Sequence, residues 1–199
     1  MAERAPARDL GVAVIGSAFM GKAHSNAWRN VRAFYPDVPG IRQRVLVARD
    51  AEATRDLAAR YGWAEAATDW RTVIDRDDVD IVDVCLPGHL HAEVTIAALE
   101  AGKHVLVEKP LANTVAEAEK MLDAARAARE HGVASMVGFN YRRVPALAMA
   151  RDLVAAGALG DVRQVKVAYL QDWLADADAP MTWRLRRETA GSGALGDLA

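Results

Sequence analysis

The feature that most constrains this chain is the apolar run Leu10–Ile15, which breaks directly into Gly16-Ser-Ala-Phe-Met-Gly21. A short, continuous apolar run is typical of a strand that is buried on both faces of a parallel sheet. The segment 22–34 then has helical periodicity. Its predicted inner stripe is Ala23, Ala27, Val31 and Phe34. The sequence therefore predicts a strand, a tight glycine turn and a helix in direct succession.

The same alternation of apolar runs and helices continues along the chain. Further strands are predicted at 44–48, 80–86, 104–107 and 134–139, and further helices at 50–61, 91–101 and 114–131. The helix at 114–131 has Thr114 and Glu117 in capping-box spacing, with Leu122 and Ala125 on its predicted inner stripe. Strands separated by helices of this length indicate an α/β fold with a doubly wound, parallel sheet.

The pattern changes after Tyr141. A helix is predicted at 145–156, with Pro145 in its first turn, and glycines follow it. The segment 162–170 alternates instead, with Val165, Val167 and Tyr169 on one face, as in an antiparallel strand with one wet face. We therefore expect a nucleotide-binding domain at 1–140, and at 141–199 the beginning of an α+β antiparallel-sheet domain that is truncated.

Composition excludes several classes of protein. Lys and Arg number 25 against 27 Asp and Glu, a net charge of -2 that argues against nucleic acid as a partner. A single cysteine, Cys85, excludes a disulfide framework. Asp172, Asp176 and Asp178 are widely spaced without a histidine partner, so no metal site is expected. No apolar run approaches the roughly 18–20 residues of a membrane helix, and the charged N-terminus is unlike a signal peptide. We expect no membrane partner and a cytoplasmic location.

The loop 16–21 lies where a strand passes into a helix, the context in which glycine patterns bind dinucleotides. Glycine lets the backbone turn tightly and approach a pyrophosphate, whose charge the helix N-terminus stabilises. Ala18 departs from the pattern, because its methyl group narrows that approach. The alternative is a packed turn without a ligand, and the strand-to-helix context favours the nucleotide. The predicted cofactor-binding residues here are Gly16, Ala18, Phe19, Met20 and Gly21.

The choice of cofactor depends on the end of the second strand, which reads Val47-Ala-Arg-Asp50. A carboxylate there accepts from the ribose 2'-hydroxyl of NAD, whereas a cation suits the 2'-phosphate of NADP. If Ala48 holds the tip, Arg49 favours NADP. If the Asp50 carboxylate instead reaches the ribose, NAD is favoured. Arg49 also reads as an ordinary solvated loop residue.

Five motifs stand in the order and spacing of one oxidoreductase family. They are Gly16–His24, Leu86–His91, Glu108–Pro110, Gly138–Arg142 and Ala190–Asp197. On these motifs the sequence resembles the Gfo/Idh/MocA family over nearly its whole length, and its last motifs look most similar to the levoglucosan dehydrogenase-like and inositol dehydrogenase-like members. The resemblance implies a Rossmann domain, NAD or NADP as cofactor, and hydride transfer between nicotinamide and a secondary alcohol of a sugar, anhydrosugar or cyclitol. It also implies a small-molecule sugar or polyol as partner and a homo-oligomer when full length.

The resemblance carries over to particular residues. Lys109, at the end of a strand, takes the place of the family's catalytic lysine, which reaches both nicotinamide and the substrate hydroxyl. Read alone, Lys109 is a surface lysine at a strand end. Pro110 shapes the turn, where a cis bond is possible. Gly88 stands where the family usually has asparagine. Further cofactor-binding residues implied by the resemblance are Leu86, Pro87, His91 and Glu108.

In the family's pattern, Asp197 is followed four residues later by the histidine that acts as acid and base, and this spacing places both side chains on one helical face. The chain stops at Ala199, before that position. We therefore expect the N-terminal part of a longer enzyme, inactive by itself. A nucleotide- or sugar-binding sensor, or an inactive fragment, is the alternative, since fold alone does not separate them. The candidate substrate residues are Tyr141, Trp173, Trp183 and Arg184, which also read as a hinge and a domain-interface cluster.

Overall fold

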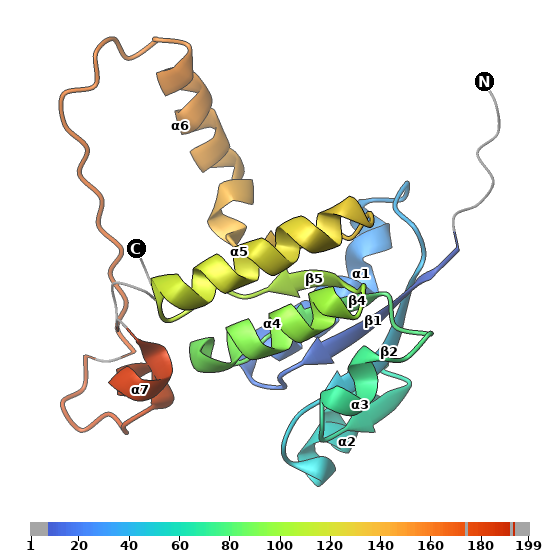
Figure 1. The fold of residues 1–199 in the computed structure, drawn as a ribbon. Helices are drawn as coiled ribbons and strands as arrows, with labels where there is room; N and C mark the ends of the chain where they lie inside the picture. The colour runs from blue at the N-terminus through green and yellow to red at the C-terminus, as the bar shows by residue number, and fades with distance from the viewer. Residues whose placement is uncertain (1–7, 174, 192, 194–199) are drawn as a thin grey trace, which may run out of the picture.

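The computed structural model describes residues 8–173, 175–191 and 193, and its centre is a six-stranded sheet (Figure 1). All neighbouring strands are parallel, in the order β3-β2-β1-β4-β5-β6. The strands are β1 (Leu10–Ile15), β2 (Ile41–Val47), β3 (Glu65–Ala67), β4 (Ile81–Val84), β5 (His104–Val107) and β6 (Ser135–Val137). This order reverses between β1 and β4, which confirms the predicted doubly wound sheet of Rossmann type.

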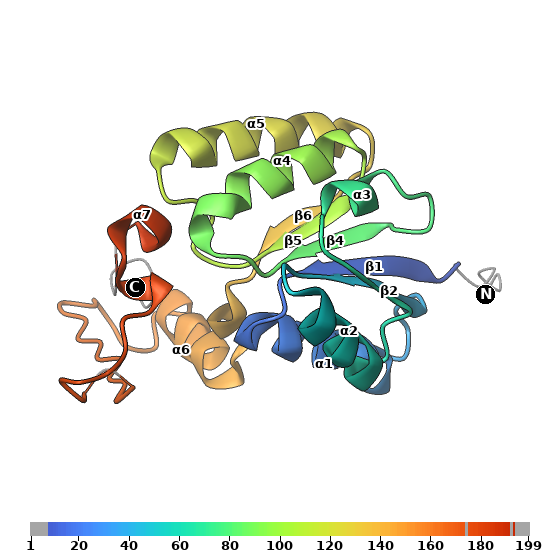
Figure 2. The same ribbon diagram turned by 90° about the horizontal axis from the view of Figure 1, so that it is seen from below.

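Helices cover both faces of the sheet (Figure 2). They are α1 (Phe19–Phe34), α2 (Ala51–Tyr61), α3 (Arg71–Ile74), α4 (His91–Glu100), α5 (Val115–Glu130), α6 (Pro145–Ala155) and α7 (Arg187–Ala190). Short 3-10 turns lie at Gly88–Leu90, Asn140–Arg143 and Trp183–Leu185. Helices α1 and α2 lie on one face, whereas α3, α4 and α5 lie on the other.

The strand β1 shows why the sheet has two hydrophobic layers. Val12 and Val14 belong to the cluster beneath α1 and α2, and Ala13 and Ile15 belong to the cluster on the opposite side. All four side chains are buried. Because successive side chains of a strand point to opposite faces, a continuous apolar run is what a doubly covered strand requires.

Local signals fix the helix ends as predicted. The Asp50 side chain accepts hydrogen bonds from the amides of Glu52 and Ala53 at the start of α2. Gly62 ends that helix with φ of 81°, a conformation that favours glycine. At the start of α5, Thr114 and Glu117 form the predicted capping box. Pro145 begins α6 as expected.

Three short elements were not predicted. Strand β3 has three residues, and helices α3 and α7 have four each, so none is long enough to show a hydrophobic period.

The predicted inner face of α1 was wrong, and that of α5 was wrong at Leu122 but confirmed at Ala125, which packs against the core. On α1, Ala23, Ala27 and Phe34 are exposed, and the helix instead buries Gly21 and Ser25. Small residues bring the helix axis close to the sheet, so they outweigh the apolar stripe. On α5, Leu122 is 48% exposed and its neighbour Met121 is buried.

The predicted antiparallel strand at 162–170 was also wrong. These residues have no strand hydrogen bonding within the part of the chain that the structure describes, and Val165 and Val167 are 75% and 86% exposed. A strand needs a hydrogen-bonded neighbour, and no described segment pairs with this one. The division into domains at residue 140 stays a prediction.

Candidate functional site

The candidate site lies where the strand order reverses, at the carboxyl ends of β1 and β4. Open α/β sheets bind ligands at this point. Here the Gly16 amide donates to the Val47 carbonyl, and the Cys85 amide donates to the Ile15 carbonyl. Gly16 has φ of 119°, and a Cβ atom on it would lie 2.3 Å from the Cys85 carbonyl oxygen. Glycine is therefore required at position 16 for the segment after β1 to approach the segment after β4 this closely.

The N-terminus of α1 is open to an anion. Its N-cap residue, Ala18, has no side chain that accepts a hydrogen bond, and the first turn contains no acidic residue. The capped helices α2 and α5 differ in this respect. Free N–H groups and the helix dipole favour a negative charge at such an end. Phe19 is 75% exposed, Met20 is partly buried and Gly21 is buried.

At the end of β2, Asp50 caps α2 and Arg49 is exposed. Both cap hydrogen bonds go to one oxygen, Oδ1. Ala48 lies at the strand tip, where its amide donates to Ala67. The end of β2 therefore has no acidic side chain at Ala48, and the carboxylate of Asp50 is engaged in capping α2.

His91 ties together two of the predicted loops. Its Nδ1 lies 2.8 Å from the Pro110 carbonyl oxygen and its Nε2 lies 2.8 Å from that of Leu86. The residue is 1% exposed. It therefore lies beneath the loop that Pro87 continues, as an anchor for the backbone on both sides.

The motif 108–110 follows β5 at the same edge of the sheet. Glu108 is 7% exposed, and its Oε2 accepts from the Lys109 amide at 3.3 Å. The Lys109–Pro110 peptide is cis. A Cβ atom on Gly138 would lie 2.8 Å from Oε1 of Glu108, so glycine there makes room for the carboxylate.

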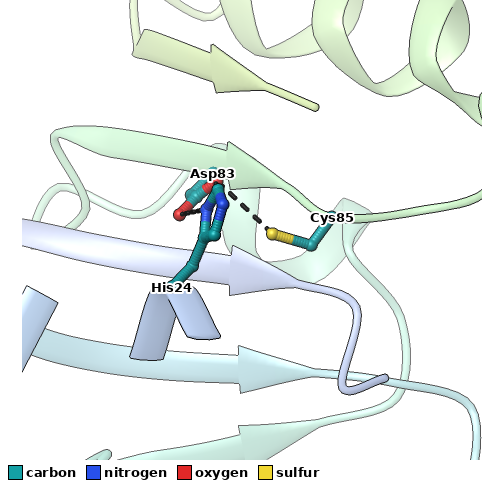
Figure 3. Close-up of side chains that lie close together, drawn as sticks. All are labelled: His24, Asp83 and Cys85. Carbon is teal, nitrogen blue, oxygen red and sulfur yellow. Dashed lines mark hydrogen bonds and ion pairs between the residues drawn. The ribbon is translucent and has the colours of Figure 1, made fainter. Parts of the chain in front are cut away.

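A buried polar cluster that the sequence reasoning missed lies directly under this edge (Figure 3). His24 of α1 places Nδ1 at 3.0 and 2.9 Å from the two Asp83 carboxylate oxygens. Its Nε2 lies 3.0 Å from Oε1 of Glu108. Trp28 donates to Asp83 at 2.6 Å, and the Cys85 thiol contacts the same carboxylate at 3.6 Å. The signal in the sequence is Asp83 itself, a charge within an apolar strand.

The cluster holds His24 in its charged form. Burial by itself lowers the pKa of His24, but hydrogen bonds to Asp83, Cys85 and Glu108 outweigh it and raise the pKa from 6.5 to about 12. Burial, followed by the charge of Asp83, raises the pKa of Cys85 to about 12, so the thiol stays protonated. The cluster is therefore an imidazolium between two carboxylates, beside a neutral thiol.

The raised pKa of His24 predicts how stability depends on pH. Its contribution is complete below the unfolded value of 6.5 and is lost as pH rises toward the folded value of about 12. Between about pH 7 and about pH 8.5, the free energy of unfolding should fall by up to about 1.4 kcal/mol per pH unit relative to that of His24→Gln. Urea unfolding at several pH values measures this, with the exposed His131→Gln as control. Parallel curves for wild type and His24→Gln would contradict it.

The predicted substrate residues form two groups. Tyr141 and Tyr169 are hydrogen bonded through their hydroxyls, and their rings meet edge to face at 5.8 Å. Trp173, 44% exposed, donates to Gln171 at 2.9 Å. The Arg184 guanidinium lies 4.6 Å over the ring of Trp183.

The segment of Trp183 and Arg184 is held near the site. The Asn113 side chain donates to the Thr189 carbonyl at 3.2 Å, and α7 contacts the turn at 88–90. A Cβ atom on Gly88 would lie 2.5 Å from Oδ1 of Asn113, so Asn113 occupies the space beside the glycine. Asp197, the other predicted catalytic residue, lies outside the described residues.

Two further features bear on the site. His24, Asp83 and Cys85 have ligand-type atoms that all lie within 4.8 Å of one another, although hydrogen bonds within the cluster already engage these atoms. A pocket of about 170 Å³ lies elsewhere, between α5 and the β5–β6 edge, and its lining has no ionisable side chain.

Of the helices in the described ranges, none has the length and apolar character to cross a membrane.

Comparison with known proteins agrees with this geometry. The model of the oxidoreductase family with an NAD-binding Rossmann fold, Gfo/Idh/MocA, matches residues 10–139, and the model of that family's C-terminal domain matches residues 147–199. Levoglucosan dehydrogenase of Pseudarthrobacter phenanthrenivorans is 44% identical over 193 residues, which cover 96% of this chain and 49% of that protein.

Solved structures show the same likeness. An oxidoreductase domain protein from Kribbella flavida has a TM-score of 0.92 and 59% identity, covering 96% of this chain and 51% of that chain. Levoglucosan dehydrogenase in complex with NADH has a TM-score of 0.86 and 42% identity over the same share of each. The chain thus spans about half the length of the relatives it matches, and the resemblance to levoglucosan dehydrogenase is confirmed. The chain belongs to the Gfo/Idh/MocA family of NAD-binding oxidoreductases.

Proposed function

We propose that the protein of which this chain forms at least a part is a nicotinamide-dependent dehydrogenase that oxidises a secondary alcohol of a sugar, anhydrosugar or cyclitol. One observation carries the proposal: the uncapped N-terminus of α1 and the Lys109 motif lie at the same edge of the sheet, on either side of the strand-order reversal. An anion-binding helix end beside a cationic side chain suits a dinucleotide whose reactive ring meets a substrate hydroxyl.

The residues of the glycine loop fit the diphosphate part of the cofactor. Backbone amides at the start of α1 donate to its oxygens, and no described acidic side chain in that turn opposes the charge. Leu86 and Pro87 would hold the nicotinamide end of the cofactor, and His91 fixes their loop by its contacts with the Leu86 and Pro110 carbonyls. A bound nicotinamide would supply the hydride acceptor for the carbinol carbon.

This chain supplies residues that hold the substrate hydroxyl. Lys109 binds and polarises the hydroxyl oxygen, a role that needs a cation at the strand end. On the family's pattern, Asp197 would orient a histidine four residues further on, and that histidine would take the hydroxyl proton. Trp183 with Arg184 supplies an aromatic face and a donor for the sugar ring, since sugar C–H surfaces pack on aromatic rings and guanidinium groups donate to hydroxyls. Tyr141 and Trp173 are proposed to contact the substrate as well.

The relatives suggest the substrate class. Levoglucosan dehydrogenase has been solved in complex with NADH and levoglucosan, and also in complex with NADH and L-sorbose. We propose an anhydrosugar or a related cyclic polyol for this protein as well. Levoglucosan is therefore the first substrate to assay, with myo-inositol as the cyclitol comparison.

Titration of this chain with NADH and with NADPH tests the nucleotide site. We expect saturable binding, observed as a change in nicotinamide fluorescence, because the first turn of α1 is free to receive the diphosphate. Arg49→Ala should weaken NADPH about two- to fivefold and leave NADH unchanged, as expected for an exposed charge contact. Arg55→Ala, on the exposed side of α2, is the control. A folded chain that binds neither nucleotide would contradict the proposal, and binding without turnover by the full-length gene product would indicate a sensor.

A further inference from the structure

We propose that His24 is the positioning residue that connects the helix of the glycine loop to the strand end that carries Lys109. This inference rests on the proposed function, because the position of Lys109 matters only if that lysine meets the substrate. His24 itself lies below the surface, with a side chain 15% exposed, so it is not assigned a contact with cofactor or substrate.

The connection is a continuous series of contacts. His24 lies one turn into α1, the helix that the glycine loop begins. Its Nε2 donates to Oε1 of Glu108, and Oε2 of the same carboxylate accepts from the Lys109 amide. The Glu108 side chain is 9% exposed, so water takes little part in holding it. A shift of α1 relative to β5 would therefore be transmitted to the backbone of Lys109.

A second anchor prevents the imidazole from turning. Nδ1 of His24 is held between both oxygens of Asp83, whose side chain is completely buried in β4. Trp28, one turn further along α1, donates to the same carboxylate. His24 and Trp28 thus bind α1 to Asp83 of β4, and His24 also binds it to Glu108, just after β5. The ring has a single orientation in which both nitrogens face carboxylates.

The charge of the ring follows from this arrangement. A neutral imidazole has one N–H group, so two carboxylate acceptors call for both nitrogens to be protonated. The titratable groups that face His24 are Asp83 from β4, Cys85 just after β4, and Glu108 just after β5. Two carboxylates and one imidazolium leave one negative charge, and the high pKa of Cys85 keeps the thiol from adding another. Without the imidazolium, two buried carboxylates would repel each other.

The backbone at Gly138 limits where the Glu108 carboxylate can lie. A Cβ atom there would lie 2.8 Å from Oε1, the oxygen that His24 contacts. The carboxylate is therefore confined between the imidazole, the Lys109 amide and the backbone of β6's end. Because the Glu108 carboxylate has no room to move on these three sides, a displacement of His24 should also displace the Lys109 backbone.

The decisive variant is His24→Gln, which keeps a polar side chain and removes the charge and one of the two contacts. In the full-length gene product, kcat should fall about 10- to 100-fold, the effect of a small misplacement of a catalytic group, with the KM for the dinucleotide within about threefold. In this chain, the backbone amide signal of Lys109 in a 15N NMR spectrum should move, and that of Met121 in α5 should not. His131→Gln, exposed at the end of α5, should change neither.

A double variant tests the route. If the effect passes through Glu108, His24→Gln combined with Glu108→Gln should be no slower than the worse single variant, because the second change removes a contact already lost. Multiplicative losses would overturn the route. A kcat for His24→Gln within threefold of wild type, or an unmoved Lys109 amide, would overturn the proposal, as would stoichiometric Zn²⁺ binding that His24→Gln abolishes.

Failure of the proposed function gives a different result. In that case wild type itself neither binds NADH nor turns over levoglucosan or myo-inositol. The Lys109 amide measurement needs no cofactor or substrate, so it still reports whether His24 is coupled to the strand end. If His24→Gln does not fold, the double variant, which has one fewer buried carboxylate, supplies the amide comparison with Glu108→Gln alone.

Discussion

Lys109→Ala should lower kcat/KM of the full-length gene product by about 10³-fold with its sugar or polyol substrate. On the proposed function, this substitution removes the cation that holds and polarises the reacting hydroxyl, and losses of about 10²–10³-fold are typical when one group that stabilises developing charge is removed. Steady-state kinetics with a range of substrate concentrations measures the loss. The affinity for NADH, read by fluorescence, should stay within about threefold.

Two further variants show whether the effect is specific. Lys120→Ala removes an exposed lysine from α5 and should leave both kcat and stability unchanged. Lys109→Arg keeps the charge on a longer and differently shaped group, so it should recover part of the binding of substrate and little of the turnover. If turnover of Lys109→Ala survives within a few-fold, the role assigned to Lys109 is wrong.

Asp83→Ala should lower the free energy of unfolding of this chain by about 3–5 kcal/mol, the range observed when one partner of a buried ion pair is removed. The substitution leaves the His24 imidazolium without its main counter-charge and the Trp28 N–H group without an acceptor. It also leaves a cavity in β4, at a position with no solvent exposure. Urea unfolding followed by circular dichroism measures the change.

The isosteric Asp83→Asn separates charge from shape. An amide keeps an acceptor oxygen for Trp28 but offers no negative charge to His24, so we expect a loss of about 1–3 kcal/mol. Asp56→Ala, on the exposed side of α2, should stay within about 0.5 kcal/mol of wild type. Equal stability of wild type and Asp83→Ala would show that the buried cluster contributes nothing.

The fold could be predicted to the extent that its elements are long and apolar. β1 shows the clearest signal, because a strand covered on both faces must be apolar at every position. The ends of α2 and α5 were equally clear, since Gly62 and the capping pair of Thr114 and Glu117 act locally. The segment 162–170 shows the limit: alternation predicts a face, but a strand also needs a neighbour.

The candidate site was predictable only in part, for a related reason. The glycine loop and the motif 108–110 are short, contiguous and located at strand ends, so their meeting at one edge follows from the parallel topology. The His24 cluster joins residues 59 and 84 positions apart, and no local pattern encodes that distance. Asp83 within an apolar strand was the one available sign, because a charge there must have a buried partner.

The first turn of α1 has no side-chain cap, and on the proposed function the dinucleotide would accept hydrogen bonds from its free N–H groups. Helices α2 and α5 carry side-chain caps, whereas α1, like α4 and α6, has none, and on the proposed function α1 would receive its cap from the dinucleotide. Cofactor concentration then enters the folding equilibrium directly: at 100 times the dissociation constant, mass action adds about 2.7 kcal/mol. On the proposed function, bound cofactor would suppress fluctuations that open residues 16–21, so the chain should resist proteolysis better with the cofactor than without it.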